Sequence, residues 1–154
     1  MQSKISHKVT TDAYIEDVWK FLMDPESVAQ CMPGTRLEEV INDRCFVGSI
    51  DIKLGFVTVR YRVQAELVDI DLETRTIAIT ATGADANDGD GRMQGNLKSN
   101  LKSLTEGGTE IHVDVSMNLS GRLIQFGSGM IRSVTKQLTK KFFTCMTQKL
   151  ESQI

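Results

Sequence analysis

The chain has 154 residues, 40% of them hydrophobic and 25% charged, with a formal net charge of −2. Its length fits one domain over residues 1–154, and its composition is ordinary for a globular protein. No run approaches the roughly 20 apolar residues of a membrane span, and the amino terminus lacks the apolar segment of a signal peptide. We therefore expect a cytoplasmic protein.

The chain opens with one predicted strand and two short predicted helices. Residues 3–11 alternate between polar and apolar side chains, which indicates a strand. Thr11 or Asp12 is expected to cap the first short helix. Asp24, followed by a proline, predicts the start of the second helix, because proline suits the first helical position. This helix is expected to end at a turn over residues 31–34.

Residues 35–120 show strand-like alternation almost without interruption. The clearest stretch is residues 57–67, in which Val, Tyr, Ala and Leu alternate with Thr, Arg, Gln and Glu. Because no helical period interrupts these strands, we expect neighbours to pair in an antiparallel sheet. One face of the sheet is apolar and the other is charged, so the apolar face must be covered by another element.

The last stretch, residues 121–152, contains no proline and predicts one long amphipathic helix. Its apolar residues recur at steps of three and four, which places them on one face. These residues are Ile131, Val134, Leu138, Phe142, Met146 and Leu150. A helix of roughly 30 residues is near 45 Å long. Only this helix can cover the apolar face, so we predict a curved, seven-stranded antiparallel sheet around it.

The apolar face mixes small and large residues, which leaves two interpretations open. Gly48, Ala65, Ala81 and Gly95 fall in phase with large side chains. This pattern is compatible with a cavity between sheet and helix, and equally with close packing of interlocking side chains. If a cavity exists, methionines suit its wall because they adapt to irregular apolar shapes. The residues expected to line it are Tyr61, Met93, Leu97, Met117, Leu119, Phe126, Met130, Ile131, Val134 and Leu138.

Charge is unevenly distributed along the chain. Residues 121–154 contain six basic residues and one acidic residue, a net charge of +5, which leaves −7 for the remainder. A solvated helix face explains this pattern simply. The alternative is a basic strip that faces an acidic partner or anionic lipid. Its residues would be Arg132, Lys136, Lys140 and Lys141.

No motif predicts a metal or a cofactor. The three cysteines are far apart and odd in number, so we expect buried or idle thiols. Residues 85–91 resemble a calcium loop, but the twelfth position is Asn96 where such loops have glutamate, so a hairpin turn is expected. Residues 127–129 lack the third glycine and the βαβ unit of a dinucleotide site.

Catalysis and nucleic-acid binding also lack a clear signature. His112 lies between two apolar residues and points away from the buried face, whereas His7 shares the phase of apolar neighbours. No serine or cysteine can be paired with a base from the sequence. Arg60 and Arg62 face outward without an aromatic platform, which argues against nucleic acid.

Several short motifs occur in order: Val-Trp-Lys-Phe-Leu at 18–22, Asp-Pro-Glu-Ser-Val-Ala at 24–29 and Cys-Met-Pro-Gly at 31–34. Spaced glycines follow between residues 83 and 95, and residues 121–129 contain Leu-Ile-Gln-Phe-Gly. In these motifs the sequence resembles the carbon monoxide dehydrogenase G-subunit family over nearly its whole length. The order of one strand, two short helices, six strands and a long helix is similar to that of START-like domains. The resemblance implies an α+β helix-grip fold.

The resemblance also implies a non-catalytic accessory protein with a hydrophobic cavity. The family is associated with membrane attachment of molybdenum-containing carbon monoxide dehydrogenase and with binding a quinone or similar lipid. We therefore expect a lipid or quinone ligand, with Tyr61 donating a hydrogen bond to its head group, and an oxidoreductase complex as partner. Some members carry a carboxyl-terminal extension to the membrane. This chain ends at Ile154, directly after the predicted helix, so we expect peripheral contact with the inner membrane face without an anchor.

Two other functions stay open at this point. The first is an enzyme on the same fold, a cyclase or hydrolase, which would need inward polar pairs. The sequence offers His7, Tyr61, Ser99 and Ser103 for such pairs. The second is an interaction module without a ligand, whose core is filled by its own side chains.

Overall fold

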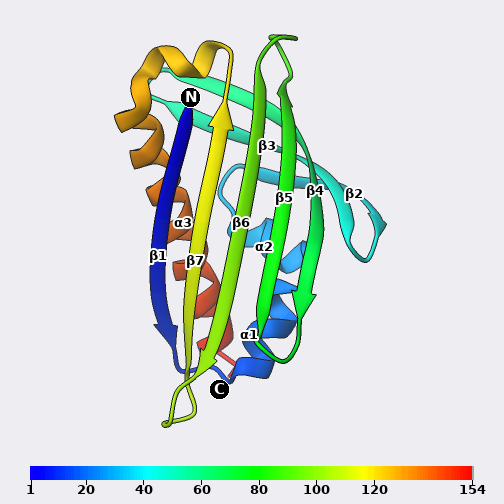
Figure 1. Cartoon of the computed structure of the whole chain (residues 1–154), viewed down its shortest axis with the longest axis vertical. Coiled ribbons are helices and arrows are strands. Elements are labelled where there is room, and N and C mark those ends of the chain that lie inside the picture. Colours follow the sequence, from blue (N-terminus) through cyan, green and yellow to red (C-terminus); the bar gives the residue numbers. More distant parts are fainter. Residues whose placement is uncertain (154) are drawn as a thin grey trace.

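The computed structural model describes residues 1–153. Within them, one strand and two short helices precede six further strands, a 3-10 helix and a long α-helix (Figure 1). In chain order the elements are β1 (Gln2–Thr11), α1 (Ile15–Leu22), α2 (Pro25–Cys31), β2 (Thr35–Asn42), β3 (Cys45–Leu54), β4 (Val57–Asp71), β5 (Thr76–Asp85), β6 (Arg92–Ser103), β7 (Thr109–Leu119), η1 (Arg122–Phe126) and α3 (Gly127–Glu151). None of the helices in this described part is long and apolar enough to span a membrane.

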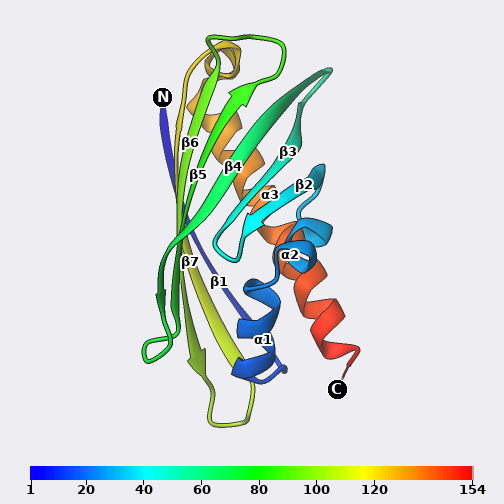
Figure 2. The same cartoon turned by 90° about the vertical axis from the view of Figure 1, so that its right-hand side faces the viewer.

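The strands form a single sheet in the order β1-β7-β6-β5-β4-β3-β2. Every pair of neighbours is antiparallel, which confirms the predicted seven-stranded antiparallel sheet. The first strand lies beside the last, and hairpins join the others along the chain. Irregularities in β2 and β4 accompany a strong curvature, so that the β2 and β3 end of the sheet bends toward the helices (Figure 2).

Helix α3 crosses the concave face of this curved sheet, as predicted (Figure 2). Its start differs from the prediction of one continuous helix from residue 121. Residues 122–126 form the 3-10 helix η1, and α3 begins at Gly127, whose φ of +82° favours glycine. The α-helix therefore has 25 residues and is about 37 Å long.

Of the two short helices, the first begins later than the sequence indicates and the second begins where it was expected. Helix α1 follows Tyr14, so neither Thr11 nor Asp12 caps it. The Thr11 hydroxyl instead accepts a hydrogen bond of 3.2 Å from the backbone N–H of Ala13. Asp24 does precede α2, with proline at the first helical position.

The buried side chains form two clusters at opposite ends of α3. Near its carboxyl end, Phe142 and Met146 pack with Val18 of α1 and Ile111 of β7. Near its amino end, Ile131 packs in a cluster made of Ile52, Leu54, Val59, Tyr61, Met93, Leu119 and Leu123. The middle of α3 lies between the two clusters, and it lines the smaller of the two cavities described below.

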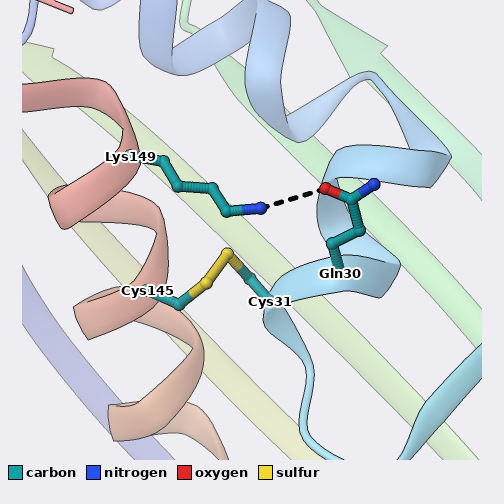
Figure 3. Close-up of a disulfide and its surroundings, with 4 residues drawn as sticks. All are labelled: Gln30, Cys31, Cys145 and Lys149. Atoms are coloured by element: carbon teal, nitrogen blue, oxygen red, sulfur yellow. Dashed lines mark hydrogen bonds between the residues drawn. A yellow bond between two sulfur atoms is a disulfide. The ribbon is translucent and has the colours of Figure 1, made fainter. Parts of the chain in front are cut away.

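A disulfide joins Cys31 at the end of α2 to Cys145 of α3, with 5.4 Å between the Cα atoms (Figure 3). The expectation of idle thiols is therefore wrong for these two residues, while Cys45 is free. Beside the disulfide, Lys149 Nζ donates a hydrogen bond of 3.0 Å to Gln30 Oε1. Helix α2 is thus fastened to α3 by one covalent and one polar contact.

Candidate ligand-binding site

Two adjoining cavities lie between the sheet and the helices. The larger one, of about 250 Å³, is lined by residues of α1, α2 and strands β2 to β6, and its wall includes Leu22, Val28, Leu37, Phe46 and Val63. The smaller one, of about 180 Å³, lies beneath α3, and its wall includes Leu54, Leu119, Leu123, Val134 and Leu138. Met32, Ile50 and Met93 contribute to both walls. Because methionine side chains adopt many shapes, the partition between the two spaces is adaptable.

Small residues on the inner face create this space. Gly48 and Ala65 line the larger cavity. Ala65, Ala81 and Gly95 lie side by side across β4, β5 and β6, so three neighbouring strands lack a large side chain at one level. Ala81 and Gly95 themselves line neither cavity.

Seven of the residues predicted from the sequence lie on the wall of the smaller cavity. They are Met93, Leu97, Met117, Leu119, Ile131, Val134 and Leu138. Tyr61 is fully buried but lies outside both walls, in the cluster around Leu119 and Leu123. Phe126 packs against the same cluster from η1.

Met130 is 45% exposed and lines neither cavity, so its predicted place on the wall is wrong. Successive helical residues are about 100° apart around the axis. Since Ile131 and Val134 face the sheet, the side chain of Met130 is turned toward solvent.

Sequence reasoning missed the part of the wall that α2 and β2 provide. The Cys-Met-Pro-Gly motif explains its geometry: Gly34 has a φ of +74°, and a Cβ there would come within 2.6 Å of the Asp51 carbonyl oxygen. The backbone N–H of Asp51 also donates to the Gly34 carbonyl oxygen at 3.0 Å. This close approach of β2 to β3 sets Met32 and Thr35 against the larger cavity.

The walls carry few polar groups. In the smaller cavity, the hydroxyls of Thr135 and Thr139 donate to the carbonyl oxygens of Ile131 and Thr135, both at 2.8 Å. Thr35 also lines the larger cavity, but its Oγ1 is buried, without a hydrogen-bond partner among residues 1–153. The two walls are therefore largely apolar.

A buried ion pair joins η1 to the end of β5. Arg122 donates from Nε to Asp85 Oδ2 at 2.6 Å and from Nη2 to Oδ1 at 2.9 Å. The Asp85 side chain is fully buried and that of Arg122 is 34% exposed. The hydrogen bond from Arg122 holds the pKa of Asp85 below its usual range, and the backbone N–H of Asn87 adds to this effect.

Tyr61 lies close to this pair without bonding to it. Burial, together with the negative charge of Asp85, raises the pKa of Tyr61 to about 12, so its hydroxyl is protonated at neutral pH. Among the residues described, this hydroxyl has no hydrogen-bond partner. Tyr61 and Asp85 lie outside both cavity walls, and the hydrogen bonds from Arg122 to Asp85 join η1 to β5.

The structure does not bring the candidate catalytic side chains together. His7 stacks on Phe143, with 5.6 Å between ring centroids. Ser99 lies on the other side of Val113, because both His7 and Ser99 pair with that residue across β7. Ser103 is exposed. Within residues 1–153, no group of three or more His, Cys, Asp or Glu side chains is arranged to hold a metal ion.

The basic residues of α3 all lie on its exposed side. Arg132, Lys136 and Lys140 follow one another at steps of four, with Lys141 beside them. Arg132 also donates from Nη1 to the carbonyl oxygen of Lys4 at 2.8 Å, which ties the start of α3 to β1. We call these four residues the basic strip.

Solved structures share this fold at low sequence identity. A conserved protein from Geobacillus kaustophilus is 21% identical, with a TM-score of 0.85 over 99% of this chain and 96% of that one. The ZhuI aromatase/cyclase from Streptomyces sp. R1128 is 16% identical, with a TM-score of 0.70 over 98% and 94% of the two chains. A START superfamily protein from Mycobacterium smegmatis is 13% identical, with a TM-score of 0.70 over 98% and 99%. These likenesses show a START-like fold.

Sequence comparison adds the family. No curated protein matches the chain significantly. The family model that describes the G subunit of carbon monoxide dehydrogenase (CoxG) matches residues 8–151, which is nearly the whole chain. Family and fold together fit a ligand-binding accessory role and are compatible with a hydrophobic small molecule. With a START-like fold and a family match of this length, the chain belongs to the CoxG family, the G subunits of carbon monoxide dehydrogenase.

Proposed function

We propose that this protein is a non-catalytic accessory protein that binds a hydrophobic small molecule, a lipid or a quinone, between its sheet and its helices. One observation carries the proposal: two adjoining apolar cavities share Met32, Ile50 and Met93 in their walls. Transfer of an apolar molecule from water into such a space is favoured by the hydrophobic effect. The methionines can move to join the two spaces around an elongated ligand.

The non-catalytic part of the proposal is supported by the placement of the polar side chains. His7 is stacked on Phe143 and separated from Ser99 by Val113, so neither is set against a second reactive group. The molecule is therefore expected to leave the protein unchanged. Native mass spectrometry before and after organic extraction checks this, because a converted ligand has a different mass.

Filling the smaller cavity tests the binding site. Val134 lines that cavity from the middle of α3, and the substitution Val134→Trp places a large ring in the space. The folded variant is expected to lose uptake of a fluorescent lipid analogue and of a short-chain quinone, because their apolar parts no longer fit. Gln137→Trp on the exposed side of the same helix is the matched control. Unchanged binding by a folded Val134→Trp protein would falsify the proposal.

We propose further that the protein binds to a membrane and is an accessory protein of a molybdenum-containing oxidoreductase of the carbon monoxide dehydrogenase type. The family name and the exposure of the basic strip support this part. Reversing Arg132, Lys136, Lys140 and Lys141 to glutamate is expected to reduce co-sedimentation with anionic vesicles. The reduction should be largest at low salt, because exposed charges are screened over about 8 Å at physiological ionic strength. Equal pelleting of both proteins at low salt would remove the membrane contact from the proposal.

A further inference from the structure

We propose that Met93 is a movable partition between the two cavities and that it sets the length of the apolar chain that the protein accepts. This inference rests on the proposed function and adds to it a residue that determines specificity. A chain too long for one cavity reaches the other only when the side chain of Met93 moves aside.

The two cavities meet at three side chains. Met32, Ile50 and Met93 line both the cavity of about 250 Å³ and the cavity of about 180 Å³. Ile50 is branched at Cβ, which restricts its side chain to few rotamers. Met32 follows Cys31, and the disulfide from Cys31 to Cys145 holds this end of α2 against α3. Met93 lies instead in the sheet, where its unbranched side chain has three rotatable bonds.

Glycines surround Met93 on the inner face of the sheet. Gly83 pairs with Met93 across β5 and β6, and Gly95 lies two residues further along β6, on the same face. A Cβ at Gly83 would come within 3.2 Å of Met93 Cε, so the methyl end of the methionine lies over this glycine. A Cβ at Gly95 would have no side chain within 4 Å. The tip of Met93 therefore has room to move along the sheet.

The side chain of Met93 also spans the boundary between the cavities. The position over Gly83 that its tip contacts lies 3.3 Å from Val63 Cγ2, and Val63 lines the larger cavity. On its other side Met93 pairs with Leu119 of β7, which lines the smaller cavity. Because Met93 is 8% exposed, a movement of its tip exchanges room between two interior spaces and not with solvent.

A series of ligands with one head group and increasing chain length tests this partition. Primary alcohols from 1-hexanol to 1-tetradecanol, in steps of two carbons, are each used to displace a fluorescent apolar probe. For wild type the affinity is expected to rise to the longest chain, by about fourfold per methylene group, because each group moves from water into an apolar space. The quantity compared between variants is the ratio of the affinities for 1-tetradecanol and 1-hexanol.

Two substitutions of Met93 should shift this ratio in opposite directions. Met93→Phe places a larger and stiffer side chain in the partition, so the affinity should stop rising once one cavity is full and the ratio should fall at least tenfold. Met93→Ala removes the partition, so the ratio should rise above that of wild type, because a long chain no longer has to displace a side chain. If Met93→Phe does not fold, Met93→Ala alone decides.

Met130 provides the matched control, because it is 45% exposed and lines neither cavity. Met130→Phe and Met130→Ala should leave the ratio unchanged. The inference is overturned if a folded Met93 variant binds the alcohols with the ratio of wild type. If wild type binds no alcohol of any length, the proposed function itself fails, whereas binding with an unchanged ratio removes only the partition.

Discussion

The two ends of the region that contains the cavities are fastened by different chemistry. At the α2 end, a disulfide between Cys31 and Cys145 ties the short helix that covers the larger cavity to α3. At the η1 end, an ion pair between Asp85 and Arg122 ties the start of the helical region to β5. Buried apolar side chains pack at both ends, around Phe142 at the first and around Ile131 at the second.

At each end, the fastening adds to a packed cluster of side chains beside a cavity. Leu123 and Ile131 belong to the cluster at the η1 end and line the smaller cavity. At the α2 end, Cys31 belongs to the cluster around Phe142, and the next residue, Met32, lines both cavities. The two ends should accordingly respond to different perturbations, the first to reduction and the second to acid.

Removal of the disulfide is expected to have the largest effect on stability. The bond links positions 114 residues apart, and closing a loop of that size destabilises the unfolded chain by about 5 kcal/mol in the chain-entropy description. The double substitution Cys31→Ser and Cys145→Ser should lower the free energy of unfolding by roughly this amount. Urea denaturation of the oxidised protein, with and without dithiothreitol, measures the same difference in wild type.

Cys45 provides the control for this experiment, because it is the free cysteine of the described chain. Cys45→Ser should keep the full response to dithiothreitol. Identical urea midpoints for oxidised and reduced wild type would contradict the role given to the disulfide at the α2 end.

The sheet and the α3 side of the site could be predicted from the sequence because their signals are local. Alternation with a period of two gives each strand, and steps of three and four put Val134 and Leu138 on the buried side of one helix. Because only one helix is long enough to cover the sheet, Val134 and Leu138 were expected to face Met93 and Met117 of the sheet. Met130, beside the change from η1 to α3, is exposed instead, whereas Tyr61 and Phe126 pack in the buried cluster but line neither cavity.

The α2 side of the site depends on contacts between distant segments, which local periods do not encode. Cys31 and Cys145 become neighbours only when α2 packs against α3, and nothing in their surroundings indicates that pairing. Strand β2 carries two irregularities in its register with β3, so its alternation is weak and Thr35 gave no signal of an inward position. The Cys-Met-Pro-Gly motif was visible as a turn, but its close approach to Asp51 was not.

Loss of the ion pair at the η1 end is expected to be the next largest effect. Asp85→Asn removes the charge that two donors of Arg122 contact. We expect a loss of about 2 kcal/mol, at the low end for buried pairs because Arg122 is 34% exposed and can turn to water. Urea denaturation at pH 7 measures it.

The pH dependence of this loss identifies its cause. The pKa of Asp85 is lowered in the folded protein, so its carboxylate contributes stability that is present above the unfolded pKa, near 4, and is lost as pH falls toward the folded pKa. The difference between wild type and Asp85→Asn should therefore be largest at neutral pH and shrink below about pH 4. Asp90→Asn, an exposed change of the same charge in the same loop, should show no such convergence. Parallel curves for wild type and Asp85→Asn down to acid pH would mean that packing, and not the charge of Asp85, holds this end closed.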